Sequence, residues 1–407
     1  MSLANWAGNI TFNARELHRP PSVEALRQIV ARADRLRPLG TAHSFNRIAD
    51  TRGEQVSVAG LPPAVEIDTD RAQVRIAAGL RYGELASRLD TAGFALPNLG
   101  SLPHISVAGA CATGTHGSGI RNGNLATAVS GLDLVTAGGD IVSVDRADPD
   151  LSGMVVALGA LGVVTSLTLD LVPAFELRQY VFDNLPHAEL SNRFDDILGM
   201  AYSVSLFTDW TGPVVNQVWV KQRTVEPPRL PATPADGPRH PVPGMPTANC
   251  TEQLGVPGPW HHRLPHFRLE FTPSSGAELQ SEFFVPRARA FDAFQALDDI
   301  RDRIAPVLQI SEIRGIAADD LWLSPCYGRD SVAFHFTWID DTAAVLPVVA
   351  AVEQALAPFD PRPHWGKVFH DVQRGQYERL PDFHRLADRY DPAGKFRNEF
   401  LERHVLG

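Results

Sequence analysis

The loop PLGTAHSFN, residues 38–46, is the stretch of sequence on which the fold assignment depends. It follows a predicted buried strand at residues 36–39 and places one histidine, His43, among small residues. Two further glycine-rich loops follow along the chain, LGSLPHIS at residues 99–106 and GTHGSG at residues 114–119. Glycine-rich turns bring backbone N–H groups close to a phosphate without a Cβ in the way. Together the three loops predict a dinucleotide site in the first part of the chain.

These glycines do not form the fingerprint of a nicotinamide dinucleotide site. No G-x-G-x-x-G motif joins an early strand to a helix with an acidic residue about 20 positions further on. Taken singly, each glycine is typical of an ordinary turn, and SVAGACATG (residues 106–114) is typical of a helix packed tightly on a sheet. The same run also suits a segment that presses against a flat ring. His43 is unobstructed between Ala42 and Ser44, and a neutral imidazole nitrogen there can attack the activated methyl group of an isoalloxazine ring.

Length and composition indicate a globular protein of two domains. At 407 residues the chain exceeds the size of one ordinary core. Its net charge of -10 repels nucleic acid and anionic membranes, so neither is expected as a partner. Cys111, Cys250 and Cys326 have no CxxC spacing and predict neither a disulfide framework nor a zinc site. The first residues, MSLANWAGN, lack the features of a signal peptide, which predicts a cytoplasmic protein, and no membrane-spanning segment is apparent.

Lysine is scarce in this chain. Only three of the 37 basic residues are lysines, namely Lys221, Lys367 and Lys395. A general preference for arginine explains the bias. A lysine that persists against it is somewhat more often found where a compact, titratable ammonium group is required.

The balance of predicted helices and strands changes near residue 175. In the first part, Ser22 is the predicted N-cap of a helix, Gly93 ends a second helix, and Gly139 lies in a hairpin turn. The elements predicted there are helices at 23–33 and 82–92, strands at 65–67 and 74–78, and a hairpin at 129–144. Strands dominate the second part, at 202–207, 217–221, 267–271, 308–315 and 332–339, with helices at 289–304 and 343–356. This pattern predicts a sheet covered on one face, and the proline-rich residues 225–259 predict an irregular surface segment.

Two predicted strands in the second part carry polar pairs at a spacing of two, so each pair projects from one face. Glu312 and Arg314 form the first pair, and His335 and Thr337 form the second. A solvated face with a surface ion pair, worth about 0–1 kcal/mol, would produce the same pattern. If the strands are neighbours, the four side chains instead form a patch that binds several hydroxyl groups. Lys367, in HWGK, can then add a positive charge near the reacting atom.

The segment WHHRLPH offers a competing metal site at His261, His262 and His266. Adjacent histidines seldom share a metal ion, and no nearby acidic residue completes a known helical motif. No metal site is therefore expected.

The motifs together resemble the alditol oxidases of the vanillyl-alcohol oxidase flavoprotein superfamily, which are relatives of the aldonolactone oxidases. The resemblance rests on TAHSFN, LGSLPHISVAG, ATGTHGSG, the strand with Glu312 and Arg314, FHFTW, HWGK and DPAGKF, and it spans nearly the full chain. It implies a two-domain α+β fold. An FAD-binding domain is expected at residues 1–175, completed by residues 371–407, and a substrate-binding cap domain with an antiparallel sheet is expected at residues 176–370.

The resemblance also implies the cofactor and the site. FAD is expected to be joined covalently to His43 and to be bound by Gly40, Thr41, Ala42, His43, Ser44, Gly100, Ser101, His104, Ser106, Gly109, Gly114, His116 and Gly117. A polyol pocket is implied at Ser101, Glu312, Arg314, His335, Thr337 and Lys367. Three of these residues, Glu312, Arg314 and Lys367, are expected to take part in catalysis.

The implied reaction oxidises the terminal primary alcohol of an alditol, such as xylitol or sorbitol, to the aldose and reduces oxygen to hydrogen peroxide. Gly100 is small enough to let oxygen approach the flavin, which favours an oxidase over a dehydrogenase. Two alternatives stay open. The flavin can serve a gulono- or galactonolactone oxidase or dehydrogenase, or the chain can be a flavin-free carbohydrate-binding protein or metal-dependent hydrolase.

Overall fold

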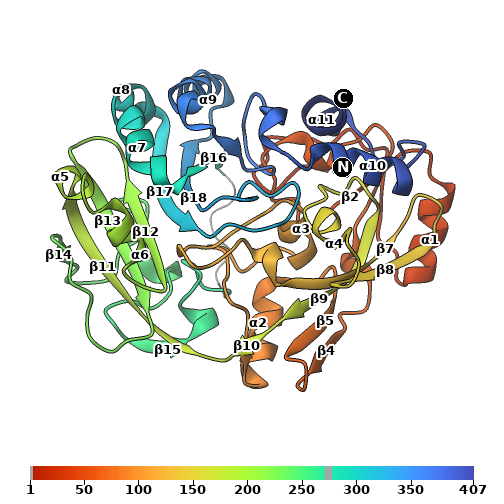
Figure 1. Cartoon of the computed structure of the whole chain (residues 1–407), viewed down its shortest axis with the longest axis horizontal. Coiled ribbons are helices and arrows are strands. Elements are labelled where there is room, and N and C mark those ends of the chain that lie inside the picture. The colour runs from red at the N-terminus through yellow and green to blue at the C-terminus, as the bar shows by residue number, and fades with distance from the viewer. Residues whose placement is uncertain (1–2, 271–276) are drawn as a thin grey trace.

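The computed structural model describes residues 3–270 and 277–407, and in these residues the chain forms four sheets with helices packed around them (Figure 1). Three smaller sheets come from the first part of the chain. Strands β1 (Glu16–His18), β3 (Glu54–Val56) and β2 (Leu36–Pro38) pair in parallel. An antiparallel sheet has the order β4 (Val65–Asp68), β5 (Gln73–Ala77), β9 (Val163–Asp170), β7 (Val129–Val135) and β8 (Ile141–Asp145). A two-stranded ribbon joins β6 (Phe94–Ala95) to β10 (Val172–Pro173).

Local signals in the first part are confirmed at the atomic level. Helix α1 (Val23–Arg32) begins where the Ser22 hydroxyl accepts a hydrogen bond from the Ala25 N–H at 3.2 Å. Helix α2 (Tyr82–Thr91) ends just before Gly93, which has φ +81°, and Gly139 turns between β7 and β8 with φ +85°. The remaining short helices of this part are α3 (Val107–Ala112) and α4 (Leu151–Met154).

The second part builds a nine-stranded antiparallel sheet. Its order is β14 (Thr233–Pro234), β11 (Glu176–Pro186), β13 (Val214–Gln222), β12 (Ser203–Thr208), β17 (Leu308–Ile316), β18 (Ser331–Ile339), β16 (Glu278–Pro286) and β19 (Arg362–Pro363), with β15 (Pro257–Pro259) beside β11. Helices α5 (His187–Leu190), α6 (Phe194–Gly199), α7 (Ala290–Asp298), α8 (Arg301–Ile304) and α9 (Thr342–Leu356) accompany it. The expectation of an antiparallel sheet covered on one face by helices is thereby confirmed.

The two faces of this sheet differ in chemistry because side chains alternate along each strand. On β18, Phe334, Phe336 and Trp338 point into the hydrophobic core beneath the helices, as their spacing predicts. His335 and Thr337 therefore point to the opposite face. That face carries the functional site.

One predicted strand is wrong. Residues 267–270 form no strand: Phe267 makes a single bridge to Cys250, and a turn follows at residues 269–270. Residue 271 lies outside the described residues. Alternating apolar side chains suggested a strand there, whereas the segment lies against the proline-rich residues 225–259, which are irregular as expected apart from short strands and turns.

Helix α9 is apolar enough to resemble a membrane-spanning helix, although it packs in the hydrophobic core. With the turn that follows it, Thr342–Phe359 is long and apolar enough to cross a membrane by length and composition, a signal that the sequence analysis did not anticipate. In the structure its side chains Val345, Val349 and Val352 are fully buried in the core between α7 and β16. Its hydrophobicity is therefore explained by packing.

The end of the chain returns to the first part. Helices α10 (Leu380–Tyr390) and α11 (Glu399–Leu401) place Phe383, Phe400 and Leu401 in the same core as β5, β7 and β9. Figure 1 shows both helices beside β2. This packing matches the expected completion of the first domain by residues 371–407, although the boundaries at 175 and 370 stay a prediction.

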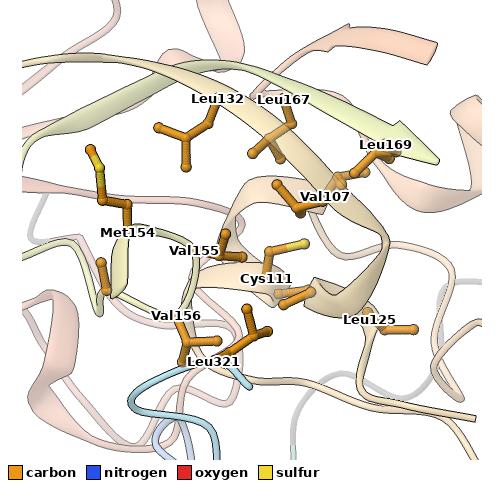
Figure 2. Packing of buried hydrophobic residues seen from close by; sticks show 14 of the residues in the cluster. Val107, Cys111, Leu125, Leu132, Met154, Val155, Val156, Leu167, Leu169 and Leu321 are labelled. Atoms are coloured by element: carbon orange, nitrogen blue, oxygen red, sulfur yellow. The ribbon is translucent and has the colours of Figure 1, made fainter. Parts of the chain in front are cut away.

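Helix α3 is fixed by this core from one side. Figure 2 shows Val107 and Cys111 pointing toward Leu132 and Leu167 of the antiparallel sheet, with Val155 close by. Because that side of α3 is buried in apolar contacts, its other side, which contains Gly109, lines a cavity.

Arg37 ties three segments together beneath the 38–46 loop. Its guanidinium is buried and donates to the carbonyls of Leu158, Gly159 and Phe396 at 2.7, 3.0 and 2.7 Å. Burial lowers the pKa of Arg37 to about 9, so the group stays charged at pH 7.

Replacing Arg37 with Met should lower the free energy of unfolding by about 3 kcal/mol, because several buried carbonyls would lose a charged donor. Urea denaturation measures the change. Arg35→Met, two positions away and exposed, is the matched control and should change stability by less than about 0.5 kcal/mol. Equal effects of the two substitutions would contradict the role given to Arg37.

Candidate active site

A single large cavity of about 580 Å³ lies between the glycine-rich loops and the polar face of the nine-stranded sheet. The loops contribute ten of the residues predicted to bind the cofactor: Gly40, Thr41, Ala42, His43, Ser44, Gly100, Ser101, Ser106, Gly109 and His116. The sheet side contributes Glu312, Arg314, His335 and Thr337, and the segment after β19 contributes Lys367. The structure thus brings together residues that are up to about 320 positions apart in the chain.

Three predicted cofactor residues are placed outside the lining of this cavity. His104 lies 2.8 Å from the Leu269 carbonyl through Nε2. A Cβ on Gly117 would lie 2.3 Å from the Leu99 carbonyl, and Gly114 has φ +66°, so both glycines are required by the close packing and turning of the loops. Their direct contact with a cofactor stays a prediction.

The junction of the first loop with α3 fits a large flat cofactor. A Cβ on Gly40 or on Gly109 would lie 2.8 Å from the Ser106 hydroxyl, so neither position has room for a side chain. The Ser106 Oγ atom is buried and has no hydrogen-bond partner among the described residues. A buried hydroxyl without a partner is costly, and a bound ligand in the cavity would supply one.

His43 faces the cavity in a fixed orientation. Its ring is stacked on Trp6, with centroids 5.2 Å apart and an interplanar angle of 16°. The Trp6 backbone N–H donates to the Ala42 carbonyl at 2.8 Å, and Ala42 adopts φ +58°, a conformation uncommon outside glycine. Burial lowers the pKa of His43 to about 4, so the imidazole is neutral at pH 7. Its Nδ1 lies 2.9 Å from the Thr41 carbonyl. A neutral ring held in this way has a lone pair available for chemistry.

The two polar strands are neighbours, as the hydroxyl-binding interpretation requires. Glu312 on β17 lies directly opposite His335 on β18, and His335 lies opposite Glu282 on β16. The three side chains form one row across the sheet, at the positions where cross-strand neighbours interact. The alternative of a solvated surface patch is wrong, because Glu312, Arg314, His335 and Thr337 are all buried.

Glu282, which the sequence analysis missed, is the centre of this network. Its Oε1 accepts from Arg314 Nη2 at 2.8 Å, and its Oε2 accepts from Lys367 Nζ at 2.7 Å. His116 Nε2, from the third loop, lies 3.0 Å from Oε1. Burial alone would raise the pKa of the Glu282 carboxyl, but its positive neighbours outweigh burial and hold that pKa well below its ordinary value. The signal was available in the sequence, since Glu278, Gln280 and Glu282 alternate along β16 as the recognised pairs do.

Lys367 connects Glu282 to the second polar strand. Its Nζ lies 2.7 Å from His335 Nδ1, and His335 Nε2 lies 3.1 Å from the Thr337 hydroxyl. Burial is the main cause that lowers the pKa of His335, so its ring is neutral and accepts from the ammonium. Burial also lowers the pKa of Lys367, while Glu282 opposes that shift. An ammonium has three donors, and two are occupied here, which leaves one for a ligand in the cavity.

Arg314 links the sheet to the loops. Its Nη1 lies 3.4 Å from the hydroxyl of Ser101, and its Nε lies 3.6 Å from Glu312 Oε1. Burial would lower the pKa of Arg314, but Glu312 and Glu282 raise it above its ordinary value. The guanidinium is therefore a permanent positive charge between the cofactor side and the sheet side of the cavity.

One histidine of the segment 260–266 enters the site. His266 Nε2 lies 2.8 Å from Glu312 Oε1, whereas His261 and His262 lie elsewhere. Within residues 3–270 and 277–407, no group of three His, Cys, Asp or Glu side chains is arranged to hold a metal ion. Sequence reasoning considered His266 only as a metal ligand and so missed its contact with the carboxylate of Glu312.

Comparison with known families agrees with this arrangement. Residues 16–145 match the family described as FAD binding domain, and residues 277–404 match the family described as D-arabinono-1,4-lactone oxidase. The fold is similar to the crystal structure of cholesterol oxidase from B. sterolicum, with a TM-score of 0.80 over 99% of this chain and 96% of that chain. At 15% identity this likeness shows the fold alone. The FAD binding domain match, together with the full-length relatives that follow, shows that the chain is an FAD-dependent oxidoreductase.

Full-length relatives narrow the class. The chain is 55% identical to an alditol oxidase from Streptomyces sp. (strain IKD472 / FERM P-14339), with 98% of each chain covered. It is 29% identical to L-gulono-1,4-lactone dehydrogenase from Mycobacterium tuberculosis, with 99% of each covered, and 27% identical to L-gulonolactone oxidase from Bos taurus, with 98% and 97% covered. The chain belongs to the alditol oxidase family, within the flavoprotein superfamily that the sequence motifs resemble.

Replacing Glu282 with Gln should lower the free energy of unfolding by about 3 kcal/mol, because the buried Lys367 ammonium would lose its paired carboxylate and Arg314 would keep only Glu312 as a counter-ion. Urea denaturation of the holoenzyme measures the change. Since the folded-state pKa of Glu282 lies below its unfolded value of about 4.3, its contribution is present above that pH and is lost as the pH falls. The difference between the two proteins should therefore shrink in acid.

Glu278→Gln is the matched control, on the same strand and the same face. Burial raises the pKa of Glu278, and its carboxylate accepts from Gln280 at 2.6 Å without contacting a charged group. This substitution should change stability by less than about 1 kcal/mol. Equal losses of unfolding free energy in the two variants would contradict the central role of Glu282 in the network. A stability difference between the wild-type and Glu282→Gln proteins that grows in acid would also contradict it.

Proposed function

We propose that the chain oxidises the terminal primary alcohol of an alditol, such as xylitol or sorbitol, to the aldose, with oxygen reduced to hydrogen peroxide. The observation that supports it is the wall of hydroxyl-binding groups facing the cofactor loops, namely Ser101, Glu312, Arg314, His335, Thr337 and Lys367. An open-chain polyol has one hydroxyl on each carbon and suits a wall with several separate donors and acceptors. The 55% identity to an alditol oxidase supports the same substrate class.

Bound FAD supplies the acceptor for the hydride and passes the electrons to oxygen. The chain's own groups prepare the alcohol. The third N–H of the Lys367 ammonium and the nearby Arg314 guanidinium lower the pKa of the reacting hydroxyl by stabilising its developing negative charge. Glu312, whose Oε2 bonds no group among the described residues, accepts from a neighbouring hydroxyl, and Thr337 and Ser101 orient others. Correct placement of the reacting carbon then contributes more than tight binding.

We further propose that FAD is held by a covalent bond between a methyl carbon of its isoalloxazine ring and an imidazole nitrogen of His43. The bond would replace one C–H bond of the methyl group and the N–H bond of the imidazole, with oxygen taking up the two electrons and two protons as hydrogen peroxide. A neutral ring, clamped between Trp6 and the Thr41 carbonyl, supports this role because a protonated ring has no lone pair to form the bond. Gly100 supports the use of oxygen. A Cβ there would meet its nearest atom, the His116 carbonyl oxygen, at 3.6 Å, so the loop leaves space beside the cavity.

Purified protein should form hydrogen peroxide with xylitol or sorbitol at a higher kcat/KM than with gulonolactone. A coupled peroxide assay across the three substrates measures this preference. A preference for the lactone would support the lactone oxidase alternative, and a colourless protein without FAD would overturn both.

Replacing Lys367 with Met should reduce kcat on the order of 100-fold, because a donor aimed at developing charge is lost. Steady-state kinetics measures the effect, and the flavin content should be unchanged. Lys395→Met removes an equal charge outside the cavity, where Nζ donates to the carbonyls of Val30 and Ala137, and should retain kcat. A fully active Lys367→Met protein would exclude the assigned role.

Acid precipitation of the protein should give a yellow pellet and a colourless supernatant. In His43→Ala the colour should move to the supernatant, because the proposed bond is absent. His104→Ala is the matched control, since His104 belongs to the second loop but does not line the cavity, and it should keep the colour in the pellet. Colour that stays in the pellet of His43→Ala would place the bond elsewhere.

A further inference from the structure

A second lysine–histidine pair adjoins the sheet side of the cavity: His266 lines the cavity, and Lys221 lies behind it. Lys221 on β13 is 1% exposed, and its Nζ donates to the carbonyl of Leu264 and lies 3.3 Å from the carbonyl of Pro265 and 3.1 Å from Nδ1 of His266. His266 in turn contacts Glu312 Oε1 at 2.8 Å. Neither Lys221 nor His266 belongs to the predicted polyol pocket.

The hydrogen bonds that run from Lys221 through His266 to Glu312 have one direction. An ammonium group has three donors and no acceptor, and Lys221 has three acceptors around it. The Glu312 carboxylate can only accept, so His266 Nε2 is the donor and Nδ1 carries the lone pair that faces Lys221. Burial is the main cause that lowers the pKa of His266 to about 4, so at pH 7 the neutral ring carries its proton on Nε2. That proton points at Glu312 Oε1.

The imidazole of His266 is also held sterically. Phe207 and Trp219 contact it edge to face, with centroids 5.5 and 5.2 Å away. Both aromatic residues lie on β12 and β13, the strands that continue the sheet beyond β17. The ring can neither tilt nor exchange its nitrogens without breaking these contacts, so the donor to Glu312 is fixed in position.

A simple ion pair does not explain the arrangement. Lys221 lies two strands from Glu312, since β12 separates β13 from β17, and the histidine spans the distance. Burial lowers the pKa of Lys221, and the charge of Glu312 opposes that shift. The sequence also keeps a lysine at position 221 although it uses arginine at most basic positions. A lysine ends in one compact ammonium group, whereas the guanidinium of arginine is larger and planar.

We propose that Lys221 and His266 are positioning residues: Lys221 anchors the imidazole through Nδ1, and His266 holds Glu312 with Oε1 engaged and Oε2 presented to the substrate hydroxyls. This inference rests on the proposed function, in which Glu312 orients the polyol. His266 lines the cavity beside Glu312, whereas Lys221 does not line it. Together they form a dyad that fixes the position of the Glu312 carboxylate, and misplacement of such a group by about 1 Å can cost on the order of 100-fold in rate.

The test compares two substitutions of His266. Gln can place its amide N–H where Nε2 lies and donate to Glu312, whereas Asn is too short to reach it. His266→Asn should lower kcat/KM for the alditol on the order of 100-fold, with most of the loss in kcat, and His266→Gln should recover most of it. Lys221→Met should lower kcat/KM by a smaller factor than His266→Asn, because Glu312 still accepts from Nε2 while the imidazole loses the group that holds it through Nδ1. His187→Asn, which alters a half-buried histidine packed on Phe294 away from the cavity, should leave kcat/KM unchanged.

A double-mutant cycle separates positioning from folding. In a Glu312→Gln background, His266→Asn should change kcat/KM by less than about 3-fold, because the group that the dyad positions has already been altered. Flavin content and thermal unfolding are measured for every variant. Equal losses in Asn and Gln variants, or a full loss in the Glu312→Gln background, would show a purely structural role and overturn the inference.

The activity of the wild-type protein in the same assay tests the proposed function separately. If that protein oxidises no alditol but oxidises a lactone, the proposed function fails, and the cycle is repeated with the lactone. If it oxidises the alditol and the cycle shows no coupling, only the positioning inference fails.

Discussion

One buried carboxylate organises the active site. Glu282 is fully buried, and it bonds Arg314 from one strand and Lys367 from the segment after β19. A charge so placed is tolerated only with partners of opposite sign in good geometry, and here each partner also requires the carboxylate. The distance between β16, β17 and the 364–367 segment is therefore fixed by electrostatics as well as by packing. Lys367 then fixes His335, and Arg314 reaches Ser101 on the cofactor side.

The two halves of the chain contribute different kinds of groups to the cavity. The first half presents glycine-rich loops and a small-residue helix, which offer backbone groups and space but few charges. The second half presents a sheet with an apolar face under helices and a polar face toward the cavity. Two lysine–histidine pairs, Lys367 with His335 and Lys221 with His266, hold neutral imidazoles in defined orientations on that face. Preorganised donors and acceptors of this kind favour a reaction that requires placement of a flexible substrate.

Helix caps, turns and the faces of strands could be predicted from the sequence, because they depend on neighbouring residues. Contacts between residues far apart in the chain were mostly not predicted. The cap at Ser22, the turn at Gly139 and the inward face of β18 follow from rules that need only neighbouring residues. The polar row at Glu312, Arg314, His335 and Thr337 was found because pairs at a spacing of two mark one face of a strand. Glu282 has the same spacing but was overlooked, and the role of His266 depends on a contact with Glu312 across 46 positions. The strand expected at residues 267–271 fails because apolar alternation does not distinguish a strand from a segment packed under an irregular loop.

The central claim is that an alditol bound against this polar face reduces FAD directly. Anaerobic mixing of the holoenzyme with xylitol, followed by absorbance in the flavin band, tests it. We expect rapid bleaching of the oxidised flavin, full recovery when oxygen is admitted, and one hydrogen peroxide for each aldose formed. A flavin that stays oxidised with every alditol, while a lactone bleaches it, would contradict the account.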